Sequence, residues 1–264
     1  MKVKPLREPR YEPKILLIDL ETTPERGFAF GVREVNLRVD QHSYTLSCAY
    51  QWYPKGKIEF VSLPDFPRFK KNHKDDEQLI QFIWKLLDEA DIVVAQNGNA
   101  FDIKYLNARF ASHRMSPPKP FGKVDTLTGL RRAFRLSSNK LDFACDYFGI
   151  GRKLPHTGME LWLACMEKKF NPKAWAVMER YNKHDVYLLR ELYKLLLPWS
   201  RHPNLSLLTG NFSGCPYCQS THIQSRGLQR TINRIKQRYQ CQSCFSWFQD
   251  LGELVGSSAV FRSM

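Results

Sequence analysis

The sequence of 264 residues contains no long apolar run, no internal repeat and no low-complexity tract. A membrane-spanning helix needs about 20 consecutive apolar residues, so the first absence excludes such a helix from the expected fold. The other two absences exclude repeat architectures and a chain that is disordered by composition. No secretory leader pattern is present, and 43% hydrophobic residues suffice for a folded core, so we expect a soluble cytoplasmic protein.

Acidic residues are scarce. The chain has 26 Asp and Glu residues against 40 Lys and Arg, which gives a formal net charge of +14 and a pI near 9.5. No acidic residue lies between Glu191 and Asp250. A strongly basic surface attracts phosphate groups, so we expect nucleic acid, either single-stranded DNA or RNA, as the partner. The sequence indicates no protein partner and no oligomeric state.

Composition divides the chain into five segments. Residues 1–13 contain four basic residues and three prolines and are expected to form a basic arm. Residues 14–200 are long enough for an α/β catalytic domain. The remainder is predicted to comprise a linker, a small module and a tail, at 201–210, 211–250 and 251–264.

Hydrophobic periodicity predicts alternating strands and helices. Strands are predicted near 14–20, 44–53, 57–63 and 91–95. Helices are predicted near 75–90, 100–113, 126–134, 139–148, 157–169 and 172–197. The stretch 22–43 is longer than a hairpin requires, and either a lid beside the site or a plain surface loop is expected there.

Two acidic motifs follow apolar strands. Asp19 and Glu21 end the run Ile15–Ile18, and residues two apart on a strand share a face. Asp102 follows the strand near 91–95 and falls in the first turn of a helix, where the helix dipole favours a carboxylate. We therefore expect the three carboxylates to face one cleft where the strands end.

A third motif, Tyr181 to Asp185, lies in the long stretch of helical periodicity, so its phenol and carboxylate are one turn apart. Clustered carboxylates are the ligands that Mg²⁺ and Mn²⁺ prefer. Two such ions about 3.5–4 Å apart can stabilise the attacking and leaving oxygens of phosphodiester hydrolysis. Tyr181, with an unperturbed pKa of about 10, is expected to position water rather than act as a base.

In this order the motifs resemble the DEDD superfamily of 3'-5' exonucleases, in its tyrosine (DEDDy) branch. The histidine branch has a histidine five residues before the last Asp, where this chain has Arg180, and His184 is assigned no role. The resemblance extends over roughly residues 14–197. The segments 140–150 and 181–189 are similar to the proofreading domains of family B DNA polymerases.

The resemblance implies an α/β fold, an RNase H-like mixed sheet flanked by helices. It implies two catalytic Mg²⁺ or Mn²⁺ ions and release of nucleoside 5'-monophosphates from a 3' end. The metal ligands that it implies are Asp19, Glu21, Asp102 and Asp185, with Tyr181 orienting the nucleophilic water. DNA is preferred because of the similarity to proofreading domains, and no residue indicates recognition of a 2'-hydroxyl.

Each motif alone has a commoner structural interpretation. Asp-x-Glu pairs often lie at solvated strand edges, Asp102 alone fits an ordinary first-turn carboxylate, and Tyr181 with Asp185 fits a surface helix pair. The three motifs together, in order, favour a nuclease site. Asp125 is expected to be a helix N-cap rather than a supporting residue of that site.

Three alternatives remain open. The first is a 3'-5' exoribonuclease for RNA processing, which matched DNA and RNA substrates would reveal. The second is a catalytically silent nucleic-acid-binding adaptor, which metal-dependent turnover would exclude. The third is an endonuclease of the same fold, which would cut a circular single strand.

Four cysteines form two Cys-x-x-Cys pairs, Cys215 with Cys218 and Cys241 with Cys244. This spacing is typical of a closed, tetrahedral site for one structural Zn²⁺, so a zinc ribbon is predicted. His222 lies nearby but is not expected to be a ligand, because four thiolates complete the shell. The remaining cysteines are expected to be reduced core thiols: Cys48, Cys145 and Cys165.

The segment between the cysteine pairs is basic. Its candidates for phosphate contacts are Arg226, Arg230, Arg234, Lys236 and Arg238. The aromatic residues either stack on unpaired bases or fill a small core, and most are expected in the core: Tyr217, Tyr239, Phe245, Trp247 and Phe248. The module resembles the zinc ribbons of transposases, but ribbons also bind proteins, so its partner stays open.

Overall fold

The computed structural model describes residues 11–28, 38–250 and 253–254. Contacts between Cα atoms divide the chain into two compact units. One unit is Lys14–Tyr193, and the other comprises the described residues before Lys14 together with those from Lys194 onward. Within the described ranges, no helix has the length and apolar character that a bilayer crossing requires.

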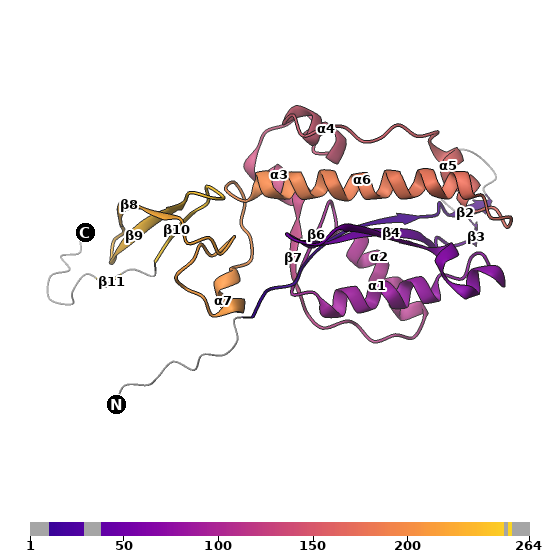
Figure 1. Ribbon diagram of the computed structural model, residues 1–264, viewed down its shortest axis with the longest axis horizontal. Coiled ribbons are helices and arrows are strands. Elements are labelled where there is room, and N and C mark those ends of the chain that lie inside the picture. Colours follow the sequence, from indigo (N-terminus) through magenta and orange to yellow (C-terminus); the bar gives the residue numbers. More distant parts are fainter. Residues whose placement is uncertain (1–10, 29–37, 251–252, 255–264) are drawn as a thin grey trace. The chain divides into compact units, whose positions relative to one another are not determined.

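The larger unit is built on a mixed sheet, which confirms the predicted fold class (Figure 1). Its strand order is β5-β4-β1-β6-β7. β1 and β5 run antiparallel to β4, whereas β6 runs parallel to β1 and β7 parallel to β6. The five strands are β1 (Ile15–Thr22), β4 (Thr45–Tyr53), β5 (Ile58–Ser62), β6 (Ile92–Ala95) and β7 (Gly122–Asp125).

Helices cover both faces of this sheet, α1 and α2 on one face and α6 on the other (Figure 1). The helices are α1 (Glu77–Glu89), α2 (Asp102–Ser112), α3 (Thr126–Ala133), α4 (Leu141–Tyr147), α5 (Met159–Cys165) and α6 (Pro172–Leu196). Two short 3-10 helices, η1 (Leu63–Asp65) and η2 (Pro67–Lys70), precede α1. All six predicted helices exist, and most are shorter than predicted by one to a few residues at each end, where periodicity carries no stop signal.

β1 is the centre of the sheet. Because helices lie on both sides, consecutive residues of this strand are buried rather than alternate ones, and Leu16, Leu17 and Ile18 are fully buried. The core continues into the apolar sides of α1 and α6, through residues such as Ile83 and Met178. This double coverage explains why the strand reads as a continuous apolar run until Asp19.

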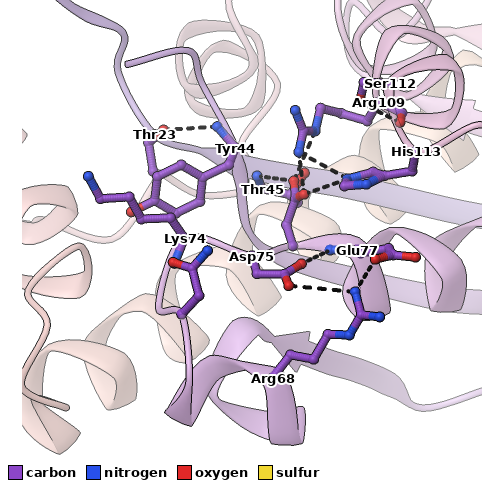
Figure 2. A network of polar contacts seen from close by, with 12 residues as sticks. Thr23, Tyr44, Thr45, Arg68, Lys74, Asp75, Glu77, Arg109, Ser112 and His113 are labelled. Atoms are coloured by element: carbon purple, nitrogen blue, oxygen red, sulfur yellow. Dashed lines mark hydrogen bonds and ion pairs between the residues drawn. The ribbon is translucent and has the colours of Figure 1, made fainter. Parts of the chain in front are cut away.

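A buried ionic network joins α1 and α2, the two helices on one face of the sheet, to the first residue of β4. The carboxylate of Asp76, fully buried before α1, accepts hydrogen bonds from the backbone of Thr45 at 2.8 Å and from Arg109 Nε at 3.0 Å. His113 Nε2 lies 2.9 Å from the same carboxylate. In Figure 2, Arg109 of α2 and His113, which directly follows α2, both point toward Thr45. One acid thus anchors α1, α2 and β4.

The segment 22–43 contains a strand pair that the sequence analysis did not predict. β2 (Arg26–Phe28) and β3 (Arg38–Gln41) pair antiparallel, with a register shift between Arg26 and Gly27. Three- and four-residue strands with a shift in register give too little alternation to be recognised. The described part of this segment is therefore not a plain loop. Residues 29–37, in the middle of the segment predicted as a lid or loop, lie outside the described residues. Most of the predicted arm at 1–13 and of the predicted tail at 251–264 also lies outside them.

The smaller unit contains the four-cysteine module, by which we mean the described residues from Leu205 onward. A short helix α7 (Leu205–Thr209) falls in the stretch that was predicted as a linker. A small antiparallel sheet follows, in which β9 (Arg234–Cys241) pairs with three strands. Those strands are β8 (Ile223–Arg230), β10 (Trp247–Gln249) and β11 (Glu253–Leu254).

Candidate active site

The end of β1 carries two carboxylates beyond its parallel neighbour. β1 pairs with β6 only as far as Leu17, which lies opposite Val94. Asp19 and Glu21 lie on the extension and share a face because they are two residues apart. On its other edge β1 stays paired with β4, with Glu21 opposite Ser47, so the extension keeps a regular strand conformation.

A tight turn after β6 brings a third carboxylate to this end of the sheet. Asp102 is the first residue of α2 and only 5% exposed. The turn before it requires glycine at position 98, because a Cβ there would lie 2.6 Å from the Cβ of Ala95. The close approach of this turn to β6 places the start of α2 beside β1.

Asp125 supports the same turn from the next strand. Its carboxylate accepts backbone hydrogen bonds from Asn97 and Asn99, each at 3.1 Å. It also accepts from the backbone of Thr128 and thereby caps α3, which confirms the N-cap prediction. Asp125 therefore does more than cap a helix, because it fixes the turn that delivers Asp102.

α6 adds the remaining residues of the third motif. Asp185 is 1% exposed, and Tyr181, one turn earlier, is also buried. One carboxylate oxygen from each of Asp19, Glu21 and Asp185 lies within 4.8 Å of the other two. The structure therefore brings residues from β1 and α6 together, with Asp102 close enough that its charge raises the pKa of Asp19.

Burial raises the pKa of every carboxyl group in this cluster, and repulsion from neighbouring carboxylates adds to the shift at Asp19 and Glu21. Burial, followed by the charge of Asp185, raises the pKa of Glu21 to about 8. Burial raises the pKa of Asp102 to about 7, although hydrogen bonds from backbone groups oppose the shift. The pKa of Asp19 is held well above its usual range, first by burial and then by Glu21 and Asp185. Such a cluster is suited to a bound cation.

Lys153 is a residue of the site that sequence reasoning missed. Its Nζ lies 2.6 Å from Asp185 Oδ2 and donates to the Tyr181 hydroxyl at 3.0 Å. Burial is the largest single influence and opposes its charge, but the charges and hydrogen-bond contacts of Asp185 and Tyr181 together outweigh burial and raise the pKa of Lys153. The residue lies in the loop between α4 and α5, where no periodicity or spacing distinguishes it from the other lysines of a basic chain.

Two further residues hold the carboxylates of β1 in place. Asn182, fully buried, donates to Asp19 Oδ2 at 2.7 Å and accepts from the Ser47 hydroxyl at 3.0 Å. Trp162 Nε1 donates to Glu21 Oε2 at 3.1 Å. Asn182 lies inside the Tyr181–Asp185 motif, so its position was a signal that sequence reasoning did not use. Trp162 belongs to the short helix α5, and no signal in the sequence indicated its contact with Glu21.

A cleft of about 440 Å³ opens beside these residues. Asp19 and Lys153 form part of its wall, so one carboxylate of the cluster and the lysine beside the cluster are reached from it. The rest of its lining combines amides, basic groups and leucines: Gln96, Asn97, Leu127, Lys140, Leu141 and Asp142. Such a mixture suits a ligand with both charged and apolar parts.

The four cysteines of the two Cys-x-x-Cys pairs converge in the small unit. Their sulfur atoms lie within 4.8 Å of one another, and Cys215–Cys244 and Cys218–Cys241 are each 3.6 Å apart. These distances exclude disulfides, whose sulfurs are about 2 Å apart. They are close to the roughly 3.8 Å that follows from tetrahedral Zn–S bonds of about 2.3 Å. The cluster therefore fits one structural zinc ion.

The predicted basic contacts all lie on the β8–β9 hairpin of the module. Arg226, Arg230 and Arg238 are exposed, whereas Arg234 and Lys236 are half-buried. Most of the aromatic residues are at least half-buried, as expected: Tyr217, Tyr239 and Phe248. The other two, Phe245 and Trp247, are exposed.

The remaining candidates have structural positions. His184 Nε2 lies 2.7 Å from the carbonyl oxygen of Arg152 and takes no part in the carboxylate cluster. His222 is not among the clustered metal-binding residues. The other cysteines are buried free thiols, as predicted: Cys48, Cys145 and Cys165.

Comparison with known proteins agrees with the observed fold. The family model of the RNase H superfamily matches residues 37–197, which is more than half of the chain. No curated protein matches. Among solved structures, the family B DNA polymerase from the hyperthermophilic archaeon Pyrobaculum calidifontis is similar, with a TM-score of 0.51 and 21% identity over 79% of this chain. The match spans 27% of the polymerase chain, so this likeness concerns the fold alone. The extent of the family match establishes that the chain belongs to the RNase H superfamily.

Proposed function

We propose that the chain is a metal-dependent 3'-5' exonuclease of the tyrosine DEDD branch that acts on single-stranded or frayed DNA. The observation that carries the proposal is the convergence of Asp19, Glu21 and Asp185, with oxygens within 4.8 Å of one another, beside an open cleft. Asp102 adds a fourth carboxylate close by, and Tyr181 lies one helical turn before Asp185.

The donors in this cluster fit hard divalent cations. All are carboxylate oxygens, which Mg²⁺ and Mn²⁺ prefer. Asp185 Oδ1 is buried, and no described residue donates a hydrogen bond to it, so a lone pair is left for a metal. Asp19, Glu21, Asp102 and Asp185 would hold two ions. When bound, such ions activate water and stabilise charge on the attacking and leaving oxygens.

The other residues of the site position the reacting groups. Burial, followed by the charge of Asp185, raises the pKa of Tyr181 to about 12, so its hydroxyl stays protonated at neutral pH and can donate to a water or phosphate oxygen. Lys153 partly neutralises Asp185. Asn182 and Trp162 fix the two carboxylates of β1. Tyr181 is thus a positioning group, not a base.

The support for DNA as the substrate is the resemblance of the last motifs to polymerase proofreading domains. The solved polymerase supports only the fold, since it shares 21% identity with the chain. RNA remains the second candidate. The four cysteines are proposed to hold zinc as a structural ion, because four thiolates leave no open coordination position.

The test is a time course on 5'-labelled linear DNA and RNA of identical sequence, with Mg²⁺ or Mn²⁺, beside a circular DNA. We expect a ladder that shortens from the 3' end, faster on DNA, with the circle intact. Asp19→Ala and Asp185→Asn should abolish the ladder. Glu59→Ala is the matched control, because Glu59 is an exposed acid on β5, away from the cluster.

Cutting of the circle would replace the exonuclease with an endonuclease, and faster loss of RNA would reverse the preference. If Asp19→Ala retained the activity of the parent protein, the assignment of the site would be wrong. If the parent protein cut nothing with either metal, the chain would be a binding protein.

A further inference from the structure

The sheet of the four-cysteine module has two chemically different faces. Along β9, alternate residues face opposite sides. Cys241 and Tyr239 belong to the side of the metal cluster, where Tyr239 stacks on Phe248 with ring centroids 5.5 Å apart. Arg234, Lys236, Arg238 and Gln240 therefore share the opposite side.

The neighbouring strands extend this opposite side. Residues directly opposite each other on antiparallel strands share a face, and Gln224 pairs with Gln240, while Gln229 pairs with Lys236. Arg226 Nε donates to the side chain of Gln240 at 3.0 Å, so it too lies on this side. We define the basic face by its members: Gln224, Arg226, Gln229, Arg234, Lys236, Arg238, Gln240, Trp247 and Gln249.

Charge on the basic face is of one sign. It carries four basic side chains and no acid among its members. Asp250, the first acid after Glu191, is engaged by the backbone of Gln237: its N–H donates to the Gln237 carbonyl, and its carboxylate accepts from the Gln237 N–H. The charged side chains that a phosphate backbone would meet among these members are all cations.

The basic face also carries one aromatic side chain, Trp247. Trp247 lies opposite Gln240 and is 51% exposed. An indole on a basic, amide-rich surface is the arrangement on which an unpaired base stacks. None of the residues that define the basic face is aliphatic, and the exposed Leu228 pairs with Gln237 and faces the other side. These residues therefore do not form the apolar cluster that a membrane surface would require.

We propose that the basic face binds single-stranded nucleic acid, with phosphates on Arg226, Arg234, Lys236 and Arg238 and a base stacked on Trp247. Arg230 is excluded from the contact, because it pairs with Ile235 and lies on the other side of the sheet. The proposal narrows the five basic residues expected to contact phosphate to four. It does not rest on the proposed catalysis.

The first test compares cations on the two faces. Binding of fluorescein-labelled oligodeoxythymidine by the full chain is followed by anisotropy at several salt concentrations. The Asp19→Ala background removes degradation, so failure here is distinguishable from failure of the proposed activity. Lys236→Gln with Arg238→Gln should lower the slope of log K against log salt by about 1.4, since each single-strand contact contributes about 0.7. Arg230→Gln removes one charge from the same hairpin and should leave the slope unchanged.

The second test separates stacking from charge. Trp247→Ala should weaken single-strand binding at least about fivefold, the fold-change for roughly 1 kcal/mol of stacking, and leave duplex binding unchanged. Phe245→Ala is the control, because Phe245 is 59% exposed but lies between Cys244 and β10, outside the sheet. Every variant must retain one zinc per chain, which shows that the module is folded.

The assignment of the face would be overturned if Arg230→Gln lowered the slope by as much per charge as Lys236→Gln with Arg238→Gln. Unchanged single-strand binding by Trp247→Ala would overturn the stacking contact. Binding of phosphatidylserine vesicles or an acidic peptide, in the absence of oligonucleotide binding, would replace nucleic acid with that partner.

Discussion

At the scale of single residues, the site depends on side chains that orient the carboxylates as much as on the carboxylates themselves. Asn182 links Asp19 to Ser47, and so connects α6, β1 and β4 through one amide. Groups that orient metal ligands commonly contribute 10–100-fold to metal affinity or activity. The amide is fully buried, so its loss would also leave Asp19 free to rotate.

Asn182→Ala is therefore expected to lower nuclease activity by about 10–100-fold and to raise the Mn²⁺ concentration needed for half-maximal rate. Titration of Mn²⁺ in the degradation assay measures both. Lys183→Ala is the control, because Lys183 forms only an i,i+4 ion pair with Glu179 on the helix surface. An unchanged metal requirement in Asn182→Ala would contradict a positioning role.

The raised pKa of Glu21 predicts how stability of the metal-free unit depends on pH. The folded-state pKa of about 8 exceeds the usual 4.5, so the folded state binds the extra proton. Its contribution is present below about 4.5 and is lost as pH rises toward about 8. The melting temperature should fall over this window, and Mn²⁺ should restore it, because a bound cation stabilises the ionised carboxylates.

Glu21→Gln should flatten that pH dependence, and Glu59→Gln should not, since Glu59 is exposed. Thermal unfolding followed by circular dichroism, with zinc retained and Mn²⁺ present or absent, measures the effect. A slope that is the same in the parent protein and in Glu21→Gln would assign the dependence to other groups.

The acidic residues were predictable from the sequence because their spacing follows strand and helix periods. Lys153 was not, because its contact with Asp185 joins residues 32 positions apart through a loop without a repeating pattern. Arg230 shows the same limit. Its residue type predicted a phosphate contact, whereas the side of the sheet on which it lies depends on the register shift between Ser225 and Leu228.

At the scale of elements, the network around Asp76 holds the first two helices against the sheet. Asp76→Asn would leave Arg109 with a weakened partner inside the structure, and we expect a loss of about 3 kcal/mol in the free energy of unfolding. Urea unfolding measures it. Asp75→Asn is the control, because Asp75 bonds the backbone of Glu77 and pairs with Arg68 nearer the surface (Figure 2), and should cost less than about 1 kcal/mol. Equal losses of unfolding free energy in the two variants would show that Asp76 does not anchor these elements.

Elements with a continuous apolar run or a clear helical repeat were predictable, whereas β2, β3 and α7 were not. The sequence of β1 contains a continuous apolar run that predicts a strand, and that of α6 contains several helical repeats that predict a helix. α7 has five residues and β2 has three, and their conformations depend on partners elsewhere in the chain. The first turn of α7, for example, is held by Leu205 donating to the carbonyl of Pro216 at 2.7 Å.

At the scale of the whole molecule, the chain consists of two units with separate sources of stability. The larger unit has an extensive apolar core, whereas the four-cysteine module buries few large side chains and has a potential metal site at its centre. A small domain of this kind generally requires a metal or disulfides to fold.

Cys218→Ser should release zinc and unfold the module, while the larger unit keeps its melting transition. Zinc content by atomic absorption and amide hydrogen exchange along β8 and β9 measure the two effects. Cys48→Ala serves as the control, since Cys48 is buried in the sheet of the larger unit. Retained zinc with unchanged exchange in Cys218→Ser would show that the cluster does not hold the module together.

The basic face and the carboxylate cluster belong to different units. If both proposals hold, the basic face retains the nucleic acid and the carboxylate cluster cleaves it, so retention and cleavage depend differently on the salt concentration. Raising the salt concentration would then shorten the run of nucleotides removed in each encounter, while the rate of each cleavage step changed little. The enzyme would pass from processive to distributive degradation without any change in its catalytic residues.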